Sequence, residues 1–428
     1  MPDSETKRRL SSTSKHVLVV WAVQVVLLPV GLVAFTPEAP RSLYAVAAVV
    51  TLASVAAGMG YVARLGLAWR SLQVCLLVGW FLGGYYSNRA VFVGEGVLAI
   101  YLCLSLYARE VREEFGVHAA PREVGVLLVL LGMCVVLALL RPQFVANKNF
   151  LDLLRQYSIV GVMAVGMTMV IVLGGIDLSV GSIVGLAGCL ATMAYRDGAS
   201  LAVAIFVALA VGAATGAFNG GFTSFLRINP FIITLGTMSM ARSLANVITS
   251  GKPVVPDAAR GEALQAIATT DILGVPSPVW LMAAVVIVGH VFLTRTRTGR
   301  HIYYIGANEE AARLSGVNVR AVKCLVYVLC GLAAGLAAII QAARVATGQP
   351  TSGTGDELRV IAAVIIGGAT FTGGEGTVLG ALVGTAILGV LSQGLVLLDV
   401  ASYWQKCVEG AVIIGAVAVD VLRRRIRR

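Results

Sequence analysis

The sequence predicts an all-α polytopic membrane protein with about fourteen transmembrane helices, divided into an N-terminal four-helix block and a ten-helix core. The 428 residues are 58% hydrophobic and only 13% charged, and their mean hydropathy is +0.87. Soluble domains carry about a quarter charged residues, and a water-soluble fold could not bury this much apolar surface in one core. Apolar runs of about 17 to 22 residues recur along the chain, the length that crosses a ~30 Å hydrocarbon layer as a helix. Glycine is abundant, with 48 residues, as expected where membrane helices pack closely.

The apolar runs place the elements in order. The predicted spans cover residues 17–35, 43–61, 65–85, 90–106, 124–140, 158–174, 178–195, 201–219, 231–249, 279–293, 324–341, 358–372, 377–398 and 403–422. The run at 65–85 contains Arg70, whose charge must reach an interface, and the runs at 279–293 and 358–372 are short for a full crossing. The predicted organisation is an N-terminal tail (1–16), an N-terminal membrane block (17–118), a second membrane domain (119–422) and a basic tail (423–428).

Basic residues predict the orientation. The net charge of +11 comes mainly from Lys and Arg in short loops and at both ends, so membrane topology explains it better than nucleic-acid binding does. The excess lies on the side of the N-terminus, which predicts that both termini are cytoplasmic. The first apolar run is long and no A-x-A site follows it, which favours an uncleaved span over a signal peptide. The seven cysteines form no CxxC pair and the four histidines are scattered, so no metal site is expected.

One apolar run is interrupted by the stretch Gly174-Gly175-Ile176-Asp177-Leu178-Ser179-Val180-Gly181-Ser182. The interruption is typical of a broken helix, in which Asp177 or Ser179 caps a new helix by accepting hydrogen bonds from its free N–H groups. Non-helical backbone at membrane depth needs protein or water around it, so such breaks gather along transport pathways. The spacing alone fits equally well with a tight turn between two spans at the membrane surface.

Polar side chains inside the apolar runs leave a second question open. Charged and polar groups there are costly and usually face the bundle interior or a water-filled cavity. Each could be a structural partner or part of a pathway. They are Glu95, Asn219, Arg242, Gln341, Gln393, Glu409 and Asp420.

The chain contains no phosphate-binding loop that could use ATP. The glycine-rich stretch 373–377 lacks the lysine that meets a nucleotide's phosphates, so we expect it to be a tight turn. Energy for transport must therefore come from a separate subunit or from an ion gradient.

Five motifs in order resemble one family, the ribose/xylose/arabinose-type permeases of ATP-binding-cassette importers, over residues of about 124 to 422. The N-terminal block to about residue 118 lies outside the resemblance. The motifs are the 174–182 stretch, Ile228-Asn229-Pro230-Phe231-Ile232 with Thr234-Leu235-Gly236, Thr298-Gly299-Arg300 with Ile305-Gly306-Ala307-Asn308, the run from Glu310 to Val317, and the run from Ile361 to Gly368.

The resemblance implies a non-catalytic transport subunit in a bacterial plasma membrane that forms the pathway for a small sugar. Its implied partners are a cytoplasmic ATPase, an extracytoplasmic sugar-binding protein and a second permease chain, identical or related; no cofactor is bound by this chain, and ATP is used by the ATPase. The helix break and pathway residues carried over are Gly174, Gly175, Asp177, Ser179, Ser182, Asn229 and Pro230. The loop that docks the ATPase, within the basic segment 294–323, contributes Gly299, Arg300, Asn308, Glu310, Ala311, Ala312 and Gly316.

The sequence departs from the family at one loop, where the family often has Gly-Tyr-Glu-Leu-Asp and this chain has Gly355-Asp356-Glu357-Leu358-Arg359. The departure leaves open whether the solute is a pentose, a hexose, a nucleoside or another small polar molecule. Two other classes of protein are alternatives: an ion-coupled secondary transporter, which would need paired acidic residues at the midplane, and a membrane-embedded enzyme, which would need clustered His, Cys or carboxylate chemistry.

Overall fold

A computed structural model describes residues 122–145 and 147–427. The chain divides into a core unit, residues 118–393, and a second unit to which residues 394–428 belong. The predicted tail 1–16 and the four predicted spans within 17–118, with Glu95, lie outside the described residues.

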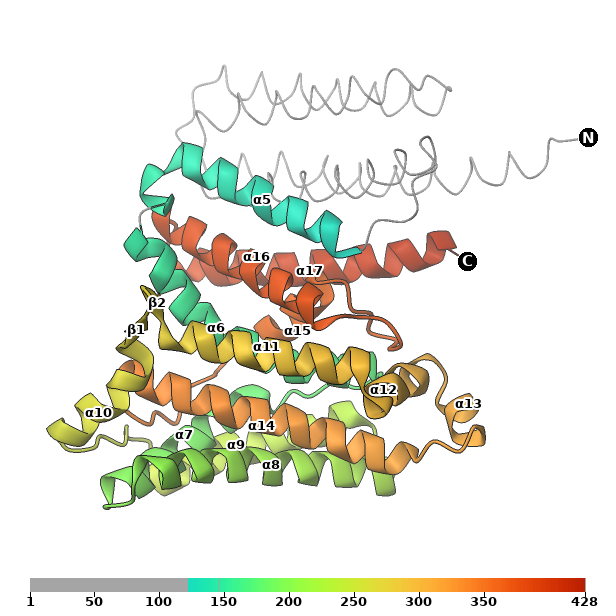
Figure 1. The fold of residues 1–428 in the computed structure, drawn as a ribbon, viewed down its shortest axis with the longest axis horizontal. Coiled ribbons are helices and arrows are strands. Elements are labelled where there is room, and N and C mark those ends of the chain that lie inside the picture. Colours follow the sequence, from blue (N-terminus) through green and yellow to red (C-terminus); the bar gives the residue numbers. More distant parts are fainter. Residues whose placement is uncertain (1–121, 146, 428) are drawn as a thin grey trace, which may run out of the picture. The chain divides into compact units, whose positions relative to one another are not determined.

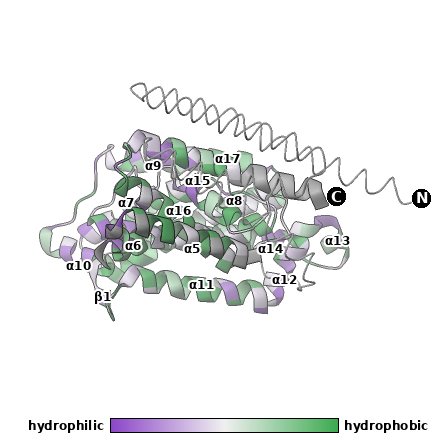
Figure 2. Ribbon diagram, turned by 90° about the horizontal axis from the view of Figure 1, so that it is seen from above, coloured by the Kyte–Doolittle hydropathy of each residue, from purple (hydrophilic) through white to green (hydrophobic). Residues whose placement is uncertain are grey.

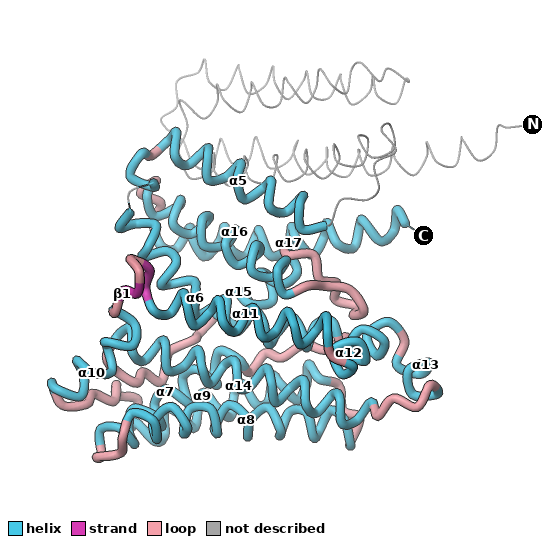
Figure 3. The backbone as a smooth tube through the Cα atoms, in the orientation of Figure 1, coloured by secondary structure: helices cyan, strands magenta, loops and turns pink. Residues whose placement is uncertain are grey.

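The described chain is almost entirely helical. Its elements are α5 (Arg122–Leu140), η1 (Pro142–Val145), α6 (Asn147–Val172), α7 (Val180–Arg196), α8 (Leu201–Phe225), α9 (Pro230–Thr249), α10 (Ala258–Thr269), β1 (Asp271–Ile272), β2 (Val275–Pro276), α11 (Ser277–Arg295), α12 (Arg297–Ala307), α13 (Glu309–Leu314), α14 (Val319–Val345), α15 (Asp356–Ile366), α16 (Val378–Leu397) and α17 (Ser402–Arg427). The two strands pair as an antiparallel hairpin just before α11, drawn in magenta in Figure 3.

Each of the ten predicted core spans coincides with a helix. Six of these helices are long and apolar enough to cross a membrane, namely α6, α8, α9, α11, α14 and α16, while α5 and α7 are shorter apolar helices. The predicted span 358–372 is wrong in length, because α15 ends at Ile366 and has 11 residues, or about 16 Å of helix, against a ~30 Å hydrocarbon layer. The total of about fourteen spans remains a prediction.

Within the core unit, polar and apolar residues are segregated along the helices. Helix α14 packs against α6, α7 and α8. Helix α10 and the β-hairpin lie at one end of these helices, and α12 and α13 lie at the other (Figure 1). Coloured by hydropathy, the long helices are largely green, and purple gathers at α10 and at α12 and α13 (Figure 2). A membrane layer therefore fits between these two ends, with the long helices crossing it.

Glycines let the central helices meet backbone to backbone. A Cβ on Gly220 of α8 would lie 2.8 Å from the Cα of Cys324 on α14. A Cβ on Gly166 of α6 would lie 2.7 Å from the Cα of Cys330, which also belongs to α14. In lipid the hydrophobic effect does not drive helices together, so small residues that allow such close packing stabilise their association.

The second unit contributes α17 among the described residues. The predicted span 403–422 lies within this helix, which is not among the six helices that meet the length and hydropathy of a membrane span. Where the chain enters α17, the Gln405 side chain donates to the Val400 carbonyl at 2.8 Å.

Candidate functional site

The chain reverses direction between α6 and α7. Arg155, early in α6, forms an ion pair with Asp271 of β1 at 3.5 Å. The carbonyl of Tyr195, at the far end of α7, accepts a hydrogen bond from Arg260 of α10. Both helices therefore have their outer ends at the α10 end of the core unit, and residues 173–179 form the turn between them.

This reversal is buried. Asp177 and Ser179 are completely shielded from solvent. A Cβ on Gly175 would lie 2.5 Å from the hydroxyl oxygen of Tyr327. Tyr327 is eight residues into α14, about 12 Å along that helix from its start. The motif is thus a turn between two antiparallel helices, as one interpretation of the sequence predicted, and it is buried inside the bundle.

A hydrogen-bonded network joins the reversal to two further helices. Asp177 Oδ1 accepts from the backbone N–H of Ser179 at 2.9 Å and from its hydroxyl at 2.6 Å. Asn219 of α8 donates from Nδ2 to Ser179 Oγ at 2.9 Å. Thr237 of α9 donates to Asn219 Oδ1 at 2.7 Å. All four residues are buried, so the network fixes the position of the turn relative to α8 and α9.

The predicted capping of α7 is wrong. Ser179 does occupy the N-cap position, but its φ and ψ of −82° and −12° are helical and its side chain accepts no hydrogen bond from the first turn. An N-cap side chain reaches the free N–H groups from an extended backbone, which Ser179 does not have. Asp177 accepts from Ser179, one residue before the helix, and from Asn219 Nδ2 at 3.5 Å, but from no N–H group of the first turn of α7. Ser182, also predicted for this site, is buried in the first turn of α7.

Two buried polar atoms at the reversal make no hydrogen bond within the described part of the chain. They are Asp177 Oδ2 and Tyr327 Oη. Buried polar atoms are nearly always paired, so each such atom in a folded protein calls for a reason. Both atoms are able to bond with a hydroxyl group, the Tyr327 hydroxyl as donor or acceptor and the Asp177 oxygen as acceptor.

A second non-helical segment, residues 346–355, runs alongside α7. A Cβ on Gly348 would lie 2.9 Å from the Cα of Cys189, and a Cβ on Gly185 would lie 2.8 Å from the carbonyl oxygen of Pro350. The glycines on α7 therefore leave a groove in which bare backbone fits. Non-helical backbone at membrane depth is stable only where protein surrounds it in this way.

Arg242 of α9 satisfies part of this exposed backbone. Its Nη1 donates to the carbonyls of Pro350 and Ser352, both at 2.6 Å. The sequence left open whether Arg242 is a structural partner or a pathway residue, and these bonds give it a structural role. The stretch that departs from the family pattern, residues 355–359, comes at the end of this segment and begins α15. Gly355 has φ of +85° and precedes α15, and its N–H donates to Glu357 Oε1 at 3.2 Å.

Four glycines, here called the glycine junction, bring three segments together: Gly174, Gly306, Gly373 and Gly374. The N–H of Gly374, between α15 and α16, donates to the carbonyl of Val172 at the end of α6, at 2.8 Å. A Cβ on Gly373 would lie 2.9 Å from the Cα of Gly174, and a Cβ on Gly306 would lie 2.6 Å from the N of Gly374. The last turn of α12 is therefore in direct backbone contact with the reversal. As predicted, the glycine-rich stretch is a turn, with the N–H of Thr370 donating to the carbonyl of Glu375 at 3.1 Å.

The residues predicted to dock an ATPase lie at the α12–α13 end. Arg300 is exposed on α12, and Gly299 is buried against the end of α11. Asn308 caps α13 by accepting from the N–H of Ala311 at 3.0 Å. Glu310 forms an ion pair with Arg313 on the same helix.

Two details of the α13 segment bear on docking. Gly316, which follows α13, has φ of +82°, a conformation that favours glycine. Ala311 is exposed, whereas Ala312 is only 5% exposed and faces its own protein. Of these two predicted docking residues, only Ala311 is open to a partner.

The remaining predicted pathway residues, Asn229 and Pro230, do not join the buried network. They begin α9, where Asn229 accepts from the N–H of Phe231 at 2.9 Å. Both line a pocket shared with the start of α14. The residues that sequence reasoning missed are Thr237, Tyr327 and the segment 346–355, none of which carries a charge or motif that marks it.

A bundle of membrane-length helices with a buried polar reversal and a second non-helical segment defines a polytopic membrane transport protein. The chain belongs to the family of permease components of the branched-chain amino acid transport system type, whose model matches residues 149–417. It is therefore a transport subunit without catalytic activity of its own, as the resemblance of its motifs implied.

Several characterised permeases are similar over most of their length. The ribose import permease protein RbsC of Escherichia coli strain K12 is 45% identical over 295 residues, covering 69% of this chain and 92% of that protein. RbsC of Bacillus subtilis is 41% identical over 299 residues, covering 70% and 92%. The L-arabinose ABC transporter permease protein AraH of Azospirillum brasilense is 34% identical over 317 residues, covering 74% and 93%. No solved structure matches.

Proposed function

We propose that this chain forms the translocation pathway of an ATP-binding-cassette importer for a small sugar, with a pentose as its substrate. The relatives with 45% and 41% identity are named for ribose, and a further relative is named for L-arabinose. Both sugars are pentoses with several hydroxyl groups, so a pathway for them needs polar groups inside the bundle.

The observation that carries the proposal is the pair of buried polar atoms at the reversal. Asp177 Oδ2 and Tyr327 Oη are shielded from solvent and make no bond to another group of the described chain. A sugar hydroxyl passing the reversal would satisfy both, which lowers the cost of bringing a hydrated solute into the membrane. Gly174 and Gly175 leave room for the chain to turn there, and Ser179 holds the Asp177 side chain in place.

Coupling to ATP hydrolysis uses the α12–α13 end. We place the ATPase on the exposed surface of α13, around Glu310 and Ala311, with Arg300 of α12 beside it. Since α12 touches the reversal through the glycine junction, a rigid-body movement of α12 and α13 moves the reversal as well. Transmission by packed backbone needs no flexible side chain, so little of the movement is lost.

The side of the membrane follows from the basic residues. The α12–α13 end carries Arg295, Arg297, Arg300, Arg313, Arg320 and Lys323, and this basic cluster supports the proposal that this end faces the cytoplasm together with both chain termini. The binding protein then delivers sugar at the α10 end. The working unit contains two permease chains, identical or related, and two ATPase subunits, and this chain binds no cofactor.

Reconstitution into proteoliposomes with the ATPase and a ribose-binding protein or an L-arabinose-binding protein tests the proposal. We expect uptake of one pentose that requires ATP inside the reconstituted system and its cognate binding protein. Uptake driven by a proton or sodium gradient without ATP would contradict the importer. ATP-dependent uptake of nucleosides but of no pentose would contradict the sugar assignment and leave the importer intact.

A further inference from the structure

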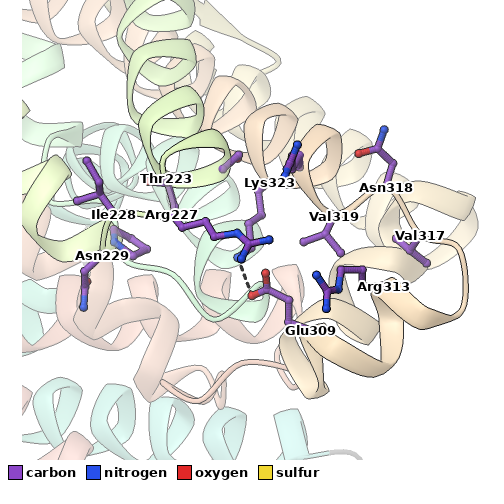
Figure 4. Close-up of a pocket in the computed structure, with 13 residues that line it drawn as sticks. Thr223, Arg227, Ile228, Asn229, Glu309, Arg313, Val317, Asn318, Val319 and Lys323 are labelled. Atoms are coloured by element: carbon purple, nitrogen blue, oxygen red, sulfur yellow. Dashed lines mark hydrogen bonds and ion pairs between the residues drawn. The ribbon is translucent and has the colours of Figure 1, made fainter.

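A polar pocket of about 690 Å³ lies between the α8–α9 turn and the segment that joins α13 to α14. Figure 4 shows that its lining comes from both segments, with the side chains of Arg227, Lys323 and Glu309 extending into the same region in that view. All its lining residues belong to the core unit. The pocket is separate from the buried reversal and from the network of Asp177.

The pocket is strongly basic. Four cationic side chains line it, namely Arg227, Arg313, Arg320 and Lys323, against one carboxylate, Glu309. Lys323 pairs with Glu309 at 2.7 Å, and Arg313 pairs with a carboxylate of α13 outside the pocket.

The other two cations are free to bind. Arg227 and Arg320 have no ion-pair partner within residues 122–145 and 147–427. They lie on different segments, the α8–α9 turn and the first turn of α14. The pocket therefore holds two arginines that an anion could bridge.

An independent observation comes from two hydroxyl groups at the base of the pocket. Thr223 and Ser224, in the last turn of α8, are 5% and 4% exposed, and both line the pocket. Neither hydroxyl finds a hydrogen-bond partner among the residues that the structure describes. A hydroxyl can donate to an anionic oxygen, so both groups suit the same ligand as the arginines.

Helix termini add to the positive field. Helices α9 and α14 both begin at the pocket, after Asn229 and Asn318. The N-terminal end of a helix carries about half a positive charge, so two of them facing one space favour an anion there.

Apolar residues beside the pocket point to the source of the anion. Phe225 and Leu226 precede Arg227 in the chain, Ile232 follows Pro230, and each of the three is 62% exposed. A basic site flanked by exposed apolar side chains at the end of membrane helices matches a lipid headgroup with its acyl chains alongside. A small soluble anion has no apolar part that could pack against these exposed side chains.

We propose that this pocket binds the phosphate group of an anionic phospholipid. Arg227 and Arg320 hold the phosphate oxygens from two segments, and the hydroxyls of Thr223 and Ser224 donate to the same group. Because Arg227 lies in the α8–α9 turn and Arg320 begins α14, a bound lipid joins α9 to the segment that follows α13. The inference rests on the pocket alone and does not depend on the proposed substrate.

Lipid binding to the purified full-length chain tests the proposal. Delipidated protein would be titrated with phosphatidylglycerol and, separately, with phosphatidylcholine, and bound lipid counted by native mass spectrometry. We expect a preference for phosphatidylglycerol that falls by about tenfold or more in the double variant Arg227→Gln, Arg320→Gln, since each basic residue at a membrane surface contributes on the order of 1 kcal/mol toward anionic lipid.

Two further variants separate a built site from general surface charge. Arg295→Gln removes an exposed charge at the same end of the molecule but outside the pocket, and it should keep the preference. Thr223→Val replaces a buried hydroxyl that has no hydrogen-bond partner in residues 122–145 and 147–427, so it should weaken phosphatidylglycerol binding without lowering the melting temperature.

Three results would overturn the proposal. The first is phosphatidylglycerol binding by the double arginine variant that equals the wild type. The second is displacement of phosphatidylglycerol by millimolar inorganic phosphate, which would assign the pocket to a soluble anion. The third is a double arginine variant that binds phosphatidylglycerol as the wild type does but no longer copurifies with the ATPase in lipid-free detergent. That result would assign the pocket to the ATPase.

Discussion

The backbone N–H of Gly374 donates to the carbonyl oxygen of Val172 at 2.8 Å, and this bond attaches the turn before α16 to the end of α6. The last four carbonyls of a helix have no partner within it, so Val172 needs such a donor. Gly306 at the end of α12 fits against the same two groups. A displacement of α12 must therefore move the reversal or break this contact.

Replacing Gly306 with alanine tests the junction. A Cβ at residue 306 would collide with backbone atoms that cannot move aside as a side chain can, and such overpacking costs about 1–3 kcal/mol. We expect a lower melting temperature and lost ATP-dependent uptake. Gly221→Ala on α8 is the control, because its Cβ would meet nothing within 4 Å and should be neutral or stabilising by up to about 1 kcal/mol. Normal transport by the Gly306→Ala protein would refute the coupling route.

The Asp177 carboxylate allows a matched pair of substitutions. Asp177→Ala removes the acceptor for the N–H and the hydroxyl of Ser179, leaving buried donors unpaired at a cost of about 1–3 kcal/mol. Asp177→Asn keeps an acceptor oxygen at the same place, so its melting temperature should stay close to that of the wild type. We expect both proteins to insert in the membrane and both to lose uptake, because neither presents the free carboxylate oxygen to a sugar. Full uptake by Asp177→Ala would reject the pathway role.

Arg242 should control the order of residues 346–355. Arg242→Met removes the donor to two carbonyls, and the segment should then exchange its amide hydrogens faster, by about tenfold for each 1.4 kcal/mol lost. Hydrogen exchange monitored by mass spectrometry measures this directly on peptides from the segment. Lys252→Met, in an exposed turn after α9, serves as the control. Equal protection in the two variants would mean that the groove on α7 alone holds the segment.

Docking on α13 predicts different outcomes for its two alanines. Ala311→Trp places a bulky group on the exposed face and should weaken copurification of the ATPase while the permease stays stable. Ala312→Trp should instead lower the melting temperature, because Ala312 is buried in its own protein. Gly316→Val forces a β-branched residue into a positive φ and should abolish uptake. If Ala311→Trp retains the ATPase fully, the docking surface lies elsewhere.

Topology is tested at the chain ends. Lys7, Arg8 and Arg9 and the basic cluster 423–428 should all be cytoplasmic, since translocating them is costly. Reporter domains fused to each terminus, active only in the cytoplasm, should both be active. An external terminus would contradict the even number of predicted spans.

Hydropathy predicted the positions of the ten core helices, but charged residues near a helix end made some predicted spans shorter than the helices. Helix α6 begins at Asn147 although the predicted span begins at 158, because Lys148, Asp152 and Arg155 end the apolar run. Those residues are helical all the same, and Asp152 and Arg155 pair at 2.9 Å one turn apart. A hydropathy search locates the part of a helix in lipid and not the helix itself.

The sequence predicted some of the residues of the buried network but none of the contacts between its helices. The sequence places Asp177 and Ser179 in one interrupted stretch, and it shows Asn219 as a polar residue within an apolar run. Their hydrogen bond joins residues 40 positions apart, and nothing in the spacing of the sequence reveals it. The sequence does not predict the role of Thr237, because a threonine hydroxyl can bond to a carbonyl of its own helix and is therefore common in apolar runs.

The groove along α7 also constrains how the protein is made. Arg242 precedes its acceptor Pro350 by 108 residues, so α7 and α9 leave the ribosome well before the segment that fills the groove between them. The early helices must enter the membrane without their final partner and remain separable until residues 346–355 arrive. The bundle therefore cannot close as α7 and α9 enter the membrane, and its closure waits for a segment in the last third of the chain.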